Sequence, residues 1–392
     1  MKSKTKLEYN PKDILIGLYW HPEYYPPTLN CINSLLQSGY NITIVCLNLF
    51  ENKDIERATG VKMVKCGVYK TISQYNSLST FKKLTLWIQF SLKLLINIKQ
   101  KKIILLYDPI PLLSYGIIYK IFKSNKIIWY HNHDILLSNL QRRFSISWFA
   151  SKFEYISFKH IDIFSLPSEE RKKYFPISYL KGKYFFLPNY PALKNIKSRN
   201  QSKDSDFIKI IFQGSISPSN GIENIINIIP FYYQGKPLKI ILKGYISQKY
   251  HEELFKHLKE KNCLKFIDYF PPSSYAEVFP LTASSDIGWA VFKSNDIMAL
   301  TLGTASNKIY EYASAGLPVI YADYPHFKSH LNKFKWAISS DLTPEDLKLK
   351  ITCILDNYKN YSNAAIDDIN NNINFDEYIK PIVDHLDEIA FP

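Results

Sequence analysis

Runs of consecutive apolar residues alternate with amphipathic segments along the first half of the chain. Continuous apolar runs of this length are typical of strands buried on both faces of a parallel sheet. They predict strands at Asp13–Tyr19, Asn41–Leu47, Ile103–Tyr107, Ile127–Tyr130 and Ile161–Leu166. Apolar residues at helical spacing predict helices between them, at Thr28–Ser38, Thr80–Lys99, Leu112–Phe122 and Ser147–Lys159. This alternation indicates a doubly wound α/β domain.

A polar segment without periodicity, Lys194–Asp206, precedes a second alternation. Strands are predicted there at Ile208–Phe212, Leu238–Leu242, Leu264–Phe266, Ile287–Ala290 and Val319–Tyr321. Helices are predicted at Gly221–Ile229, Gln248–Lys261, Tyr275–Leu281, Lys308–Ala315 and Glu345–Asn357. A chain of 392 residues is also too long for one ordinary core. We therefore expect two Rossmann-like domains, 1–190 and 208–370, joined by a linker at 191–207 and followed by an amphipathic segment, 371–392.

Basic residues are concentrated in the first of these domains. Residues 1–190 contain 27 Lys and Arg against 12 Asp and Glu, whereas residues 191–392 contain 22 against 23. Within a net charge of +14, this asymmetry indicates an anionic partner for the first half, such as a membrane surface, a nucleic acid or an acidic polymer. No nucleic-acid recognition motif accompanies the charge, so we expect no nucleic-acid partner.

One basic segment, Thr80–Lys102, combines aromatic and apolar residues at helical spacing with flanking lysines. Such a helix suits an interfacial membrane contact, although a core-facing helix with a solvated back is the commoner case. Basic-aromatic clusters at Arg142–Phe144 and Arg171–Phe175 favour the membrane contact. The five cysteines are scattered, and neither a signal peptide nor a transmembrane segment is visible. We therefore expect a cytoplasmic protein that associates peripherally with a membrane.

The segment Ser306–Ile320, SNKIYEYASAGLPVI, reads as a loop, a helix, a glycine stop and a buried strand. Ser306 is a plausible N-cap, and Gly316 ends the helix. One acid, Glu311, lies within this otherwise apolar helix, where a carboxylate needs a partner such as a pair of sugar hydroxyls. The helix start is also suited to a phosphate. The alternative is an ordinary αβ unit in which Glu311 is simply exposed.

Two stretches of the second half resemble one known family. Asn307–Ile320 resembles the donor-nucleotide motif of the GT-B glycosyltransferases, specifically the retaining family 4 group. Ile210–Glu223 resembles the first strand, glycine loop and helix of that family's C-terminal domain. The resemblance implies a GT-B fold, with two Rossmann-like domains facing a central cleft and a last helix that packs back on the first domain.

The resemblance also implies a function. We expect a retaining, metal-independent glycosyltransferase that moves a sugar from a nucleoside diphosphate sugar to a glycan or lipid-linked acceptor. This expectation places the protein in bacterial capsule or lipopolysaccharide assembly, on the cytoplasmic face of the inner membrane. The sequence has no Asp-x-Asp between strands of the kind that metal-dependent transferases use, and no H-E-x-x-H or P-loop pattern, so we expect no metal and no cofactor besides the donor substrate.

The family's motifs map onto specific residues of this chain. Glu311 would bind the ribose, and it is also a candidate catalytic residue together with His133 and Asp134 of a short His-acid motif. The donor would be held by the following residues: Gly214, Ser215, Lys243, Gly244, Thr304, Ser306, Asn307, Lys308 and Glu311. Candidate acceptor contacts are His21, Glu23 and His131. For Lys243 and Lys308, a solvated surface charge is an equally good interpretation.

The chain departs from the family at three charged positions. Gly303 stands where the family has an acid, eight positions before Glu311. Ser215 replaces an arginine, and Asn220 replaces a lysine. Two interpretations follow. Either Lys243, Lys308 or a residue of the first domain supplies the missing charge, or the chain is a degenerate GT-B module that binds a glycan or a partner without catalysis.

Overall fold

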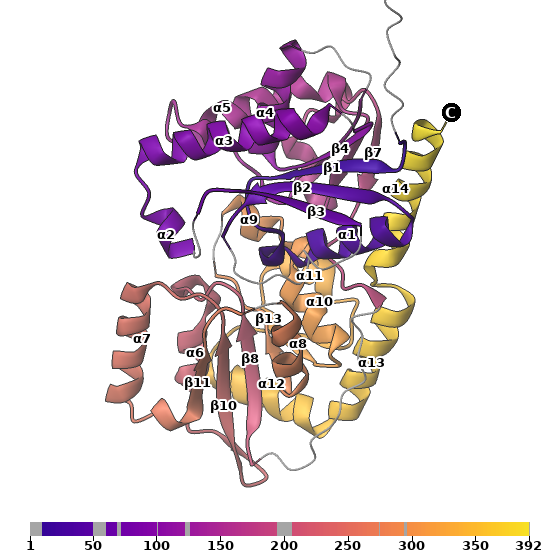
Figure 1. Ribbon diagram of the computed structural model, residues 1–392. Helices are drawn as coiled ribbons and strands as arrows, with labels where there is room; N and C mark the ends of the chain where they lie inside the picture. The colour runs from indigo at the N-terminus through magenta and orange to yellow at the C-terminus, as the bar shows by residue number, and fades with distance from the viewer. Residues whose placement is uncertain are drawn as a thin grey trace, which may run out of the picture. The chain divides into compact units, whose positions relative to one another are not determined.

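The computed structural model describes residues 10–49, 60–68, 72–99, 101–121, 126–193, 206–273, 275–293 and 296–391. The chain divides into two compact units (Figure 1). Unit 1 contains Met1–Pro188 together with Asp376–Pro392, and unit 2 contains Asn189–Phe375. Most of the expected linker, residues 194–205, lies outside the described residues. Both units are α/β, as the apolar runs predict.

The sheet of unit 1 is parallel throughout its seven described strands, in the order β3-β2-β1-β4-β5-β6-β7. The strands are β1 (Asp13–Leu18), β2 (Asn41–Leu47), β3 (Val61–Cys66), β4 (Ile103–Tyr107), β5 (Ile127–His131), β6 (Ile163–Leu166) and β7 (Lys183–Phe186). All residues of β4 and β5 are buried, which explains why these strands read as unbroken apolar runs. The sequence prediction missed β3 and β7, whose burial is mixed.

The helices of unit 1 flank this sheet. They are α1 (Pro26–Gln37), α2 (Ile72–Asn76), α3 (Thr80–Ile98), α4 (Pro109–Ile121), α5 (Ile146–Ser157) and α14 (Phe375–Ala390). Helices α3, α4 and α5 lie together on one side of the sheet (Figure 1). From α14, the Asp387 carboxylate binds Lys12 Nζ at 2.6 Å and the Tyr40 hydroxyl at 2.5 Å. The C-terminal helix therefore packs on the first sheet.

Unit 2 contains a sheet with the order β11-β10-β8-β12-β13-β14, with β9 paired antiparallel to β10. Its strands are β8 (Ile208–Gln213), β9 (Tyr232–Tyr233), β10 (Lys236–Lys243), β11 (Ile267–Phe270), β12 (Ile287–Trp289), β13 (Val319–Ala322) and β14 (Ala337–Ser340). Its helices are α6 (Ile222–Ile226), α7 (Gln248–Glu260), α8 (Tyr275–Ala283), α9 (Ile297–Leu300), α10 (Asn307–Ser314), α11 (Pro325–Leu331), α12 (Pro344–Asp356) and α13 (Tyr358–Asn371).

One predicted strand of unit 2 is wrong. Residues Leu264–Phe266 form a 3-10 turn, and β11 begins only at Ile267. The Phe266 N–H donates to the Cys263 carbonyl at 3.0 Å, which closes the turn. Phe266 is buried by this turn while Leu264 is exposed, so the apolar run reflects packing of a turn rather than of a strand.

Candidate functional site

The loops that follow β8 and β10 run side by side at the carboxyl edge of the unit 2 sheet. Gly214 and Gly244 both have positive φ angles, of 119° and 136°. The Gly214 N–H donates to the Lys243 carbonyl at 2.9 Å, and a Cβ on Gly244 would lie 1.9 Å from the Gly214 oxygen. Only glycine permits this approach, so the two loops present bare backbone at the edge. Ser215, next to Gly214, is exposed.

Helix α10 begins near this edge, after a short 3-10 turn at Gly303–Ala305. Ser306 occupies the N-cap position, as predicted, but its side chain makes no capping hydrogen bond. Ser306 Oγ and Asn307 Oδ1 are buried, and neither has a hydrogen-bond partner among the described residues. The Thr304 carbonyl accepts a hydrogen bond from the Asn189 N–H at 3.0 Å. The helix start thus combines N–H groups with polar oxygens that a ligand could satisfy.

Lys308 extends from the first turn of α10 towards the glycine loop. Its Nζ lies 4.0 Å from the centre of the Phe212 ring and 4.6 Å from that of Phe292. A Cβ on Gly214 would lie 3.5 Å from the same amine. Burial lowers the pKa of Lys308 to about 7, and the charge of Glu311 opposes this shift. The amine is therefore a partly desolvated cation beside the loop, and not a solvated surface charge.

Glu311 is buried, with 8% of its surface exposed, so the alternative of a simply exposed acid is wrong. The Gln213 side-chain amide donates to its Oε2 atom. Gln213 in turn accepts from the Thr282 hydroxyl at 2.6 Å. This chain of hydrogen bonds orients the carboxylate at the end of β8, one turn along α10 from Lys308.

The remaining predicted cation points elsewhere. Lys243 Nζ donates to the Pro271 carbonyl at 2.6 Å, and burial lowers the pKa of Lys243. Asn220 is also engaged, because its side chain accepts from the Ser217 N–H at 2.8 Å in a capping box. Among the predicted donor residues, Lys308 is therefore the cation that lies next to the Gly214 loop.

Gly303 has a φ of +30°, and a Cβ there would lie 3.1 Å from the His330 ring. A side chain at this position would be strained by its backbone and crowded by the ring. The packing of α11 against this turn therefore disfavours an acidic side chain at position 303, where the family that the sequence resembles has one.

In unit 1, the predicted residues gather at the carboxyl ends of β1, β4 and β5. A cavity of about 140 Å³ lies there, and Trp20, Tyr25, Tyr107, Asp108 and Asp134 are among its lining residues. The aromatic rings and carboxylates that line it are the groups that proteins use to bind sugars through stacking and hydroxyl hydrogen bonds.

Two histidines of the predicted motif are packed inside unit 1. The His133 ring stacks between Tyr25 and Tyr107, at centroid distances of 4.8 and 4.9 Å. Its Nε2 lies 2.9 Å from Thr28 Oγ1. His131 Nδ1 lies 2.8 Å from Ser165 Oγ, and burial lowers the pKa of His131 to about 3. Burial also lowers the pKa of His133 well below its usual value. Both rings are therefore neutral at physiological pH.

Asp134 is the member of this motif that is exposed. Its N–H and that of His133 donate to Asp108 Oδ1, at 3.3 and 2.7 Å. Burial raises the pKa of Asp108 well above its usual value, and the charge of Asp134 adds to this shift. The buried Arg171 donates to the His133 carbonyl. Sequence reasoning missed Asp108, although it directly follows an unbroken apolar strand. It assigned Arg171 to a basic cluster facing a membrane, and this is wrong because the Arg171 side chain is buried.

The two predicted acceptor residues after β1 differ in exposure. His21 is buried and caps the turn Pro22–Tyr24, where its Nδ1 accepts from the Glu23 N–H at 3.4 Å. Glu23 is partly exposed. Within the described ranges, no three side chains of His, Cys, Asp or Glu are grouped as a metal ion would require.

Comparison with known proteins identifies the fold. No family model matches the sequence. No curated protein matches it either. Among solved structures, HepE from Anabaena in complex with UDP and glucose matches with a TM-score of 0.69 at 13% identity, covering 96% of this chain and 99% of HepE. WaaG, a glycosyltransferase involved in lipopolysaccharide biosynthesis, matches with a TM-score of 0.65 at 12% identity, covering 97% of this chain and 100% of WaaG.

A third similar structure is a putative UDP-N-acetylglucosamine 2-epimerase from Listeria monocytogenes. It matches with a TM-score of 0.60 at 12% identity, and the match covers 97% of this chain and 98% of the Listeria chain. Two Rossmann-like α/β units of the GT-B type are therefore confirmed as the fold of this chain. At such low identities the likeness concerns the fold alone.

Proposed function

We propose that the protein is a glycosyltransferase that uses a nucleoside diphosphate sugar. The observation that carries this proposal is the arrangement on α10, where the partly desolvated Lys308 and the oriented Glu311 flank a glycine-lined edge. A diphosphate needs a cation and N–H donors, and a ribose needs a hydrogen-bond acceptor. This edge of unit 2 offers all three.

In this proposal the diphosphate binds between the Gly214 loop and the start of α10. Lys308 neutralises its charge in place of the family's arginine and lysine. Ser306 Oγ and Asn307 Oδ1 become hydrogen-bond partners of the bound ligand. Glu311 accepts from the ribose hydroxyls. HepE, which shares the fold, was solved in complex with UDP and glucose, and this supports a UDP-sugar as the first donor to test.

The acceptor in this proposal is a glycan or lipid-linked sugar that occupies the aromatic cavity of unit 1. The fold shared with WaaG supports a role in bacterial surface polysaccharide assembly. Asp134 is the exposed group of the motif that reaches this cavity. We extend the proposal to a retaining and metal-independent reaction, on the basis of the sequence resemblance.

A donor panel tests this function. Release of nucleotide from UDP-glucose and other sugar nucleotides is measured with and without candidate acceptors, and donor affinity is measured by calorimetry. We expect Glu311→Ala to weaken UDP binding about 10- to 100-fold, because hydrogen bonds to a charged group contribute ~1.5–3 kcal/mol. The matched control is Glu260→Ala, which removes an exposed acid at the end of α7. Unchanged UDP affinity in Glu311→Ala would show that Glu311 does not hold the ribose.

The alternative function is a degenerate module that binds a glycan or a partner without catalysis. Ser215, Asn220 and Gly303 favour this alternative, since each stands where the family has a charge. Tight binding of UDP together with sugar release would exclude it. Binding of a glycan without any nucleotide affinity would support it.

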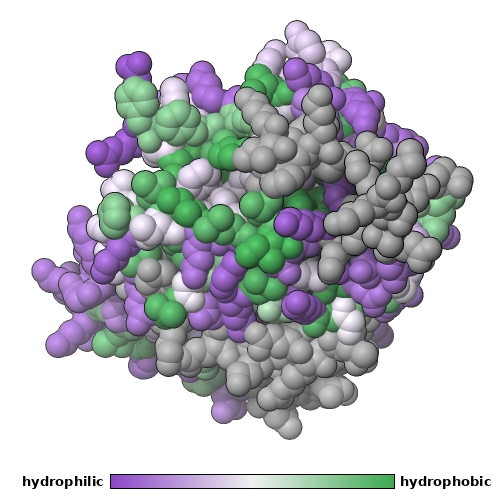
Figure 2. Space-filling view, turned by 45° about the horizontal axis from the view of Figure 1, so that its top comes forward, coloured by the Kyte–Doolittle hydropathy of each residue, from purple (hydrophilic) through white to green (hydrophobic). Residues whose placement is uncertain are grey.

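We also propose that unit 1 docks on an anionic membrane surface through α3. This helix buries Leu86, Phe90, Leu94 and Ile98 against the core, but its opposite face is apolar too. The exposed apolar residues there, spaced as one stripe, are Phe81, Leu84, Ile88, Leu92 and Ile96. Lysines flank the stripe, which is the pattern of an interfacial helix. Figure 2 turns the top of the Figure 1 view, where α3, α4 and α5 lie, towards the reader. Green apolar patches lie there among purple polar residues.

Vesicle sedimentation tests this docking. We expect anionic vesicles to retain the protein at low salt and to release it as salt rises, because screening weakens the attraction. Ile88→Glu should weaken retention, whereas Leu349→Glu, the same change at an exposed apolar residue of α12 in unit 2, should weaken it less. Equal partition to neutral vesicles would contradict an electrostatic dock. Among the described residues, no helix is both long enough and apolar enough to cross a bilayer.

A further inference from the structure

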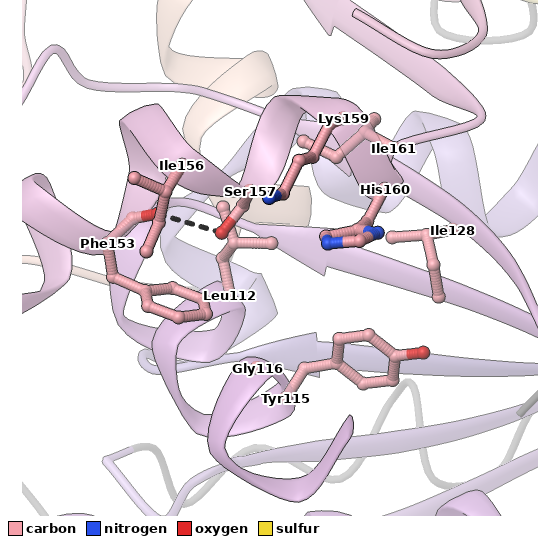
Figure 3. Close-up of a pocket in the computed structure, with 10 residues that line it drawn as sticks. All are labelled: Leu112, Tyr115, Gly116, Ile128, Phe153, Ile156, Ser157, Lys159, His160 and Ile161. Carbon is pink, nitrogen blue, oxygen red and sulfur yellow. Dashed lines mark hydrogen bonds between the residues drawn. The ribbon is translucent and has the colours of Figure 1, made fainter. Parts of the chain in front are cut away.

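A cavity of about 220 Å³ lies between α4, α5 and the sheet of unit 1. Much of its wall is apolar, with Leu112 from α4, Ile128 from β5 and Ile156 from α5. Figure 3 shows Leu112 between Phe153 on one side and His160 on the other. The volume exceeds the ~150 Å³ of engineered apolar cavities that bind small hydrocarbons.

The shape of the cavity follows from one close contact between its helices. A Cβ on Gly116 would lie 1.9 Å from the Phe153 ring, so α4 and α5 approach closely at this point. The Ser157 hydroxyl at the wall donates to the Phe153 carbonyl at 2.8 Å, the dashed line in Figure 3. Its hydrogen is therefore already used, and this hydroxyl has no hydrogen left to donate to a ligand.

The rim of the cavity is basic. Lys159 and His160 line it and are exposed. Burial, together with the charges of Lys159 and Lys181, lowers the pKa of His160, so the lysines provide the positive charge near neutral pH. An anionic group at the rim would be attracted by these charges, while an apolar group would be favoured inside.

The surface beside the cavity is also apolar. Ile117, Tyr155 and Ile156 are 45%, 55% and 52% exposed, and Ile156 contributes both to this surface and to the cavity wall. The cavity lies near the amino ends of β5 and β6, through Ile128 and Ile161. The candidate transfer site follows the carboxyl ends of the strands, so the cavity is separate from it.

We propose that this cavity binds a hydrocarbon chain that carries an anionic head group. The chain lies between α4 and α5, and the head group lies at Lys159. At roughly 30 Å³ per chain atom, the liquid volume of one water molecule, the cavity holds at least about seven chain atoms. The proposal goes beyond glycosyl transfer, because it concerns a second site with its own ligand.

Calorimetry with butyl, hexyl, octyl and decyl phosphate tests the proposal, at concentrations below those at which each forms micelles. Each pair of added methylenes should tighten binding about fifteen-fold until the cavity is full, and further methylenes should add little. Ile156→Trp should weaken octyl phosphate binding at least ten-fold by filling the mouth from a half-exposed position. Tyr155→Trp, an exposed residue of α5 outside the lining, is the matched control and should bind normally.

The head group is tested separately. Lys159→Gln should weaken octyl phosphate binding several-fold and leave octanol binding unchanged, whereas Lys152→Gln, at an exposed lysine of α5, should change neither. Binding that is independent of chain length, or that persists in Ile156→Trp, would overturn the proposal. UDP-glucose affinity, measured on the same samples, keeps this result separate from the test of glycosyl transfer. Competition by phosphatidylglycerol vesicles would identify a bilayer lipid as the source of the chain, and its absence a free amphiphile.

Discussion

The protonation of Lys308 should control donor binding near neutral pH. Burial lowers the pKa of this amine to about 7 in the unliganded protein. A diphosphate is attracted only to the charged form, so the amine must carry its proton when the donor binds. Binding therefore favours protonation and raises the pKa of Lys308 in the complex. Consequently, donor affinity should fall as the pH rises through about 7, and binding above this pH should take up a proton.

The size of the effect follows from this pKa. Roughly nine-tenths of the amines are charged at about pH 6 and roughly one-tenth at about pH 8. Because apparent affinity scales with the fraction of the protein that is competent to bind, the dissociation constant should rise about ten-fold over this range. This corresponds to about 1.4 kcal/mol. UDP-glucose is the suitable probe, since its diphosphate has no proton that titrates in the same range.

Calorimetry across this pH range, repeated in buffers with different ionisation enthalpies, measures both affinity and proton uptake. Lys308→Arg keeps its charge at every pH tested, so its affinity should be nearly independent of pH. Lys308→Met should bind weakly and should also be independent of pH. Its unliganded form should be more stable than the wild type, by about 1 kcal/mol or more, because a desolvated amine has been replaced by an apolar chain of similar length.

Two results would refute this reasoning. One is an affinity for UDP-glucose that stays constant between about pH 6 and pH 8 in the wild type. The other is a wild-type pH dependence that persists unchanged in Lys308→Met, which would assign the titration to another group. Either result would leave the phosphate charge to be neutralised elsewhere in the chain.

Three further predictions concern the framework around the sites. Gly244→Ala should lower the melting temperature much more than Gly235→Ala, because the new Cβ at position 244 would lie 1.9 Å from a backbone oxygen. At Gly235, with φ +81°, a Cβ meets nothing within 4 Å, so Gly235→Ala should lower the free energy of unfolding by only ~1–2 kcal/mol. Asp387→Asn should weaken the contact of α14 with Lys12 and lower stability by at most ~1 kcal/mol in denaturant titrations, since the pair is partly exposed. Gly303→Glu should lower the melting temperature without tightening UDP-glucose binding, and tighter binding would show that the turn accepts the acid.

The fold was predictable where burial leaves a strong pattern. Strands such as Ile103–Tyr107 are buried along their whole length and read as unbroken apolar runs. Val61–Cys66 forms a strand whose residues are mostly only partly buried, and two lysines break its pattern, so periodicity did not reveal it. Leu264–Phe266 shows the opposite error, because packing of a turn also selects apolar residues.

The candidate site was predictable in its residues but not in their environments. The sequence places Lys308 near the start of a helix, but Phe212 and Phe292, which surround its amine, come from distant parts of the chain. Whether the lysine is solvated or desolvated therefore depends on tertiary packing. The same holds for Glu311, whose orientation depends on Gln213 across the sheet edge. Local patterns carry no information about such contacts.

Two of the three departures from the charged positions of the family that the sequence resembles have physical consequences. Asn220 now caps a turn, and Gly303 adopts a backbone angle that disfavours any side chain. Neither position can simply regain its charge without disturbing local structure. In the proposed site, the negative charge of the diphosphate is therefore neutralised by Lys308, a single amine whose pKa is about 7. A site with an arginine would stay charged at all physiological pH values. If this chain binds a sugar nucleotide, its affinity should therefore be lower and more sensitive to pH than that of a site with the family's full set of charges.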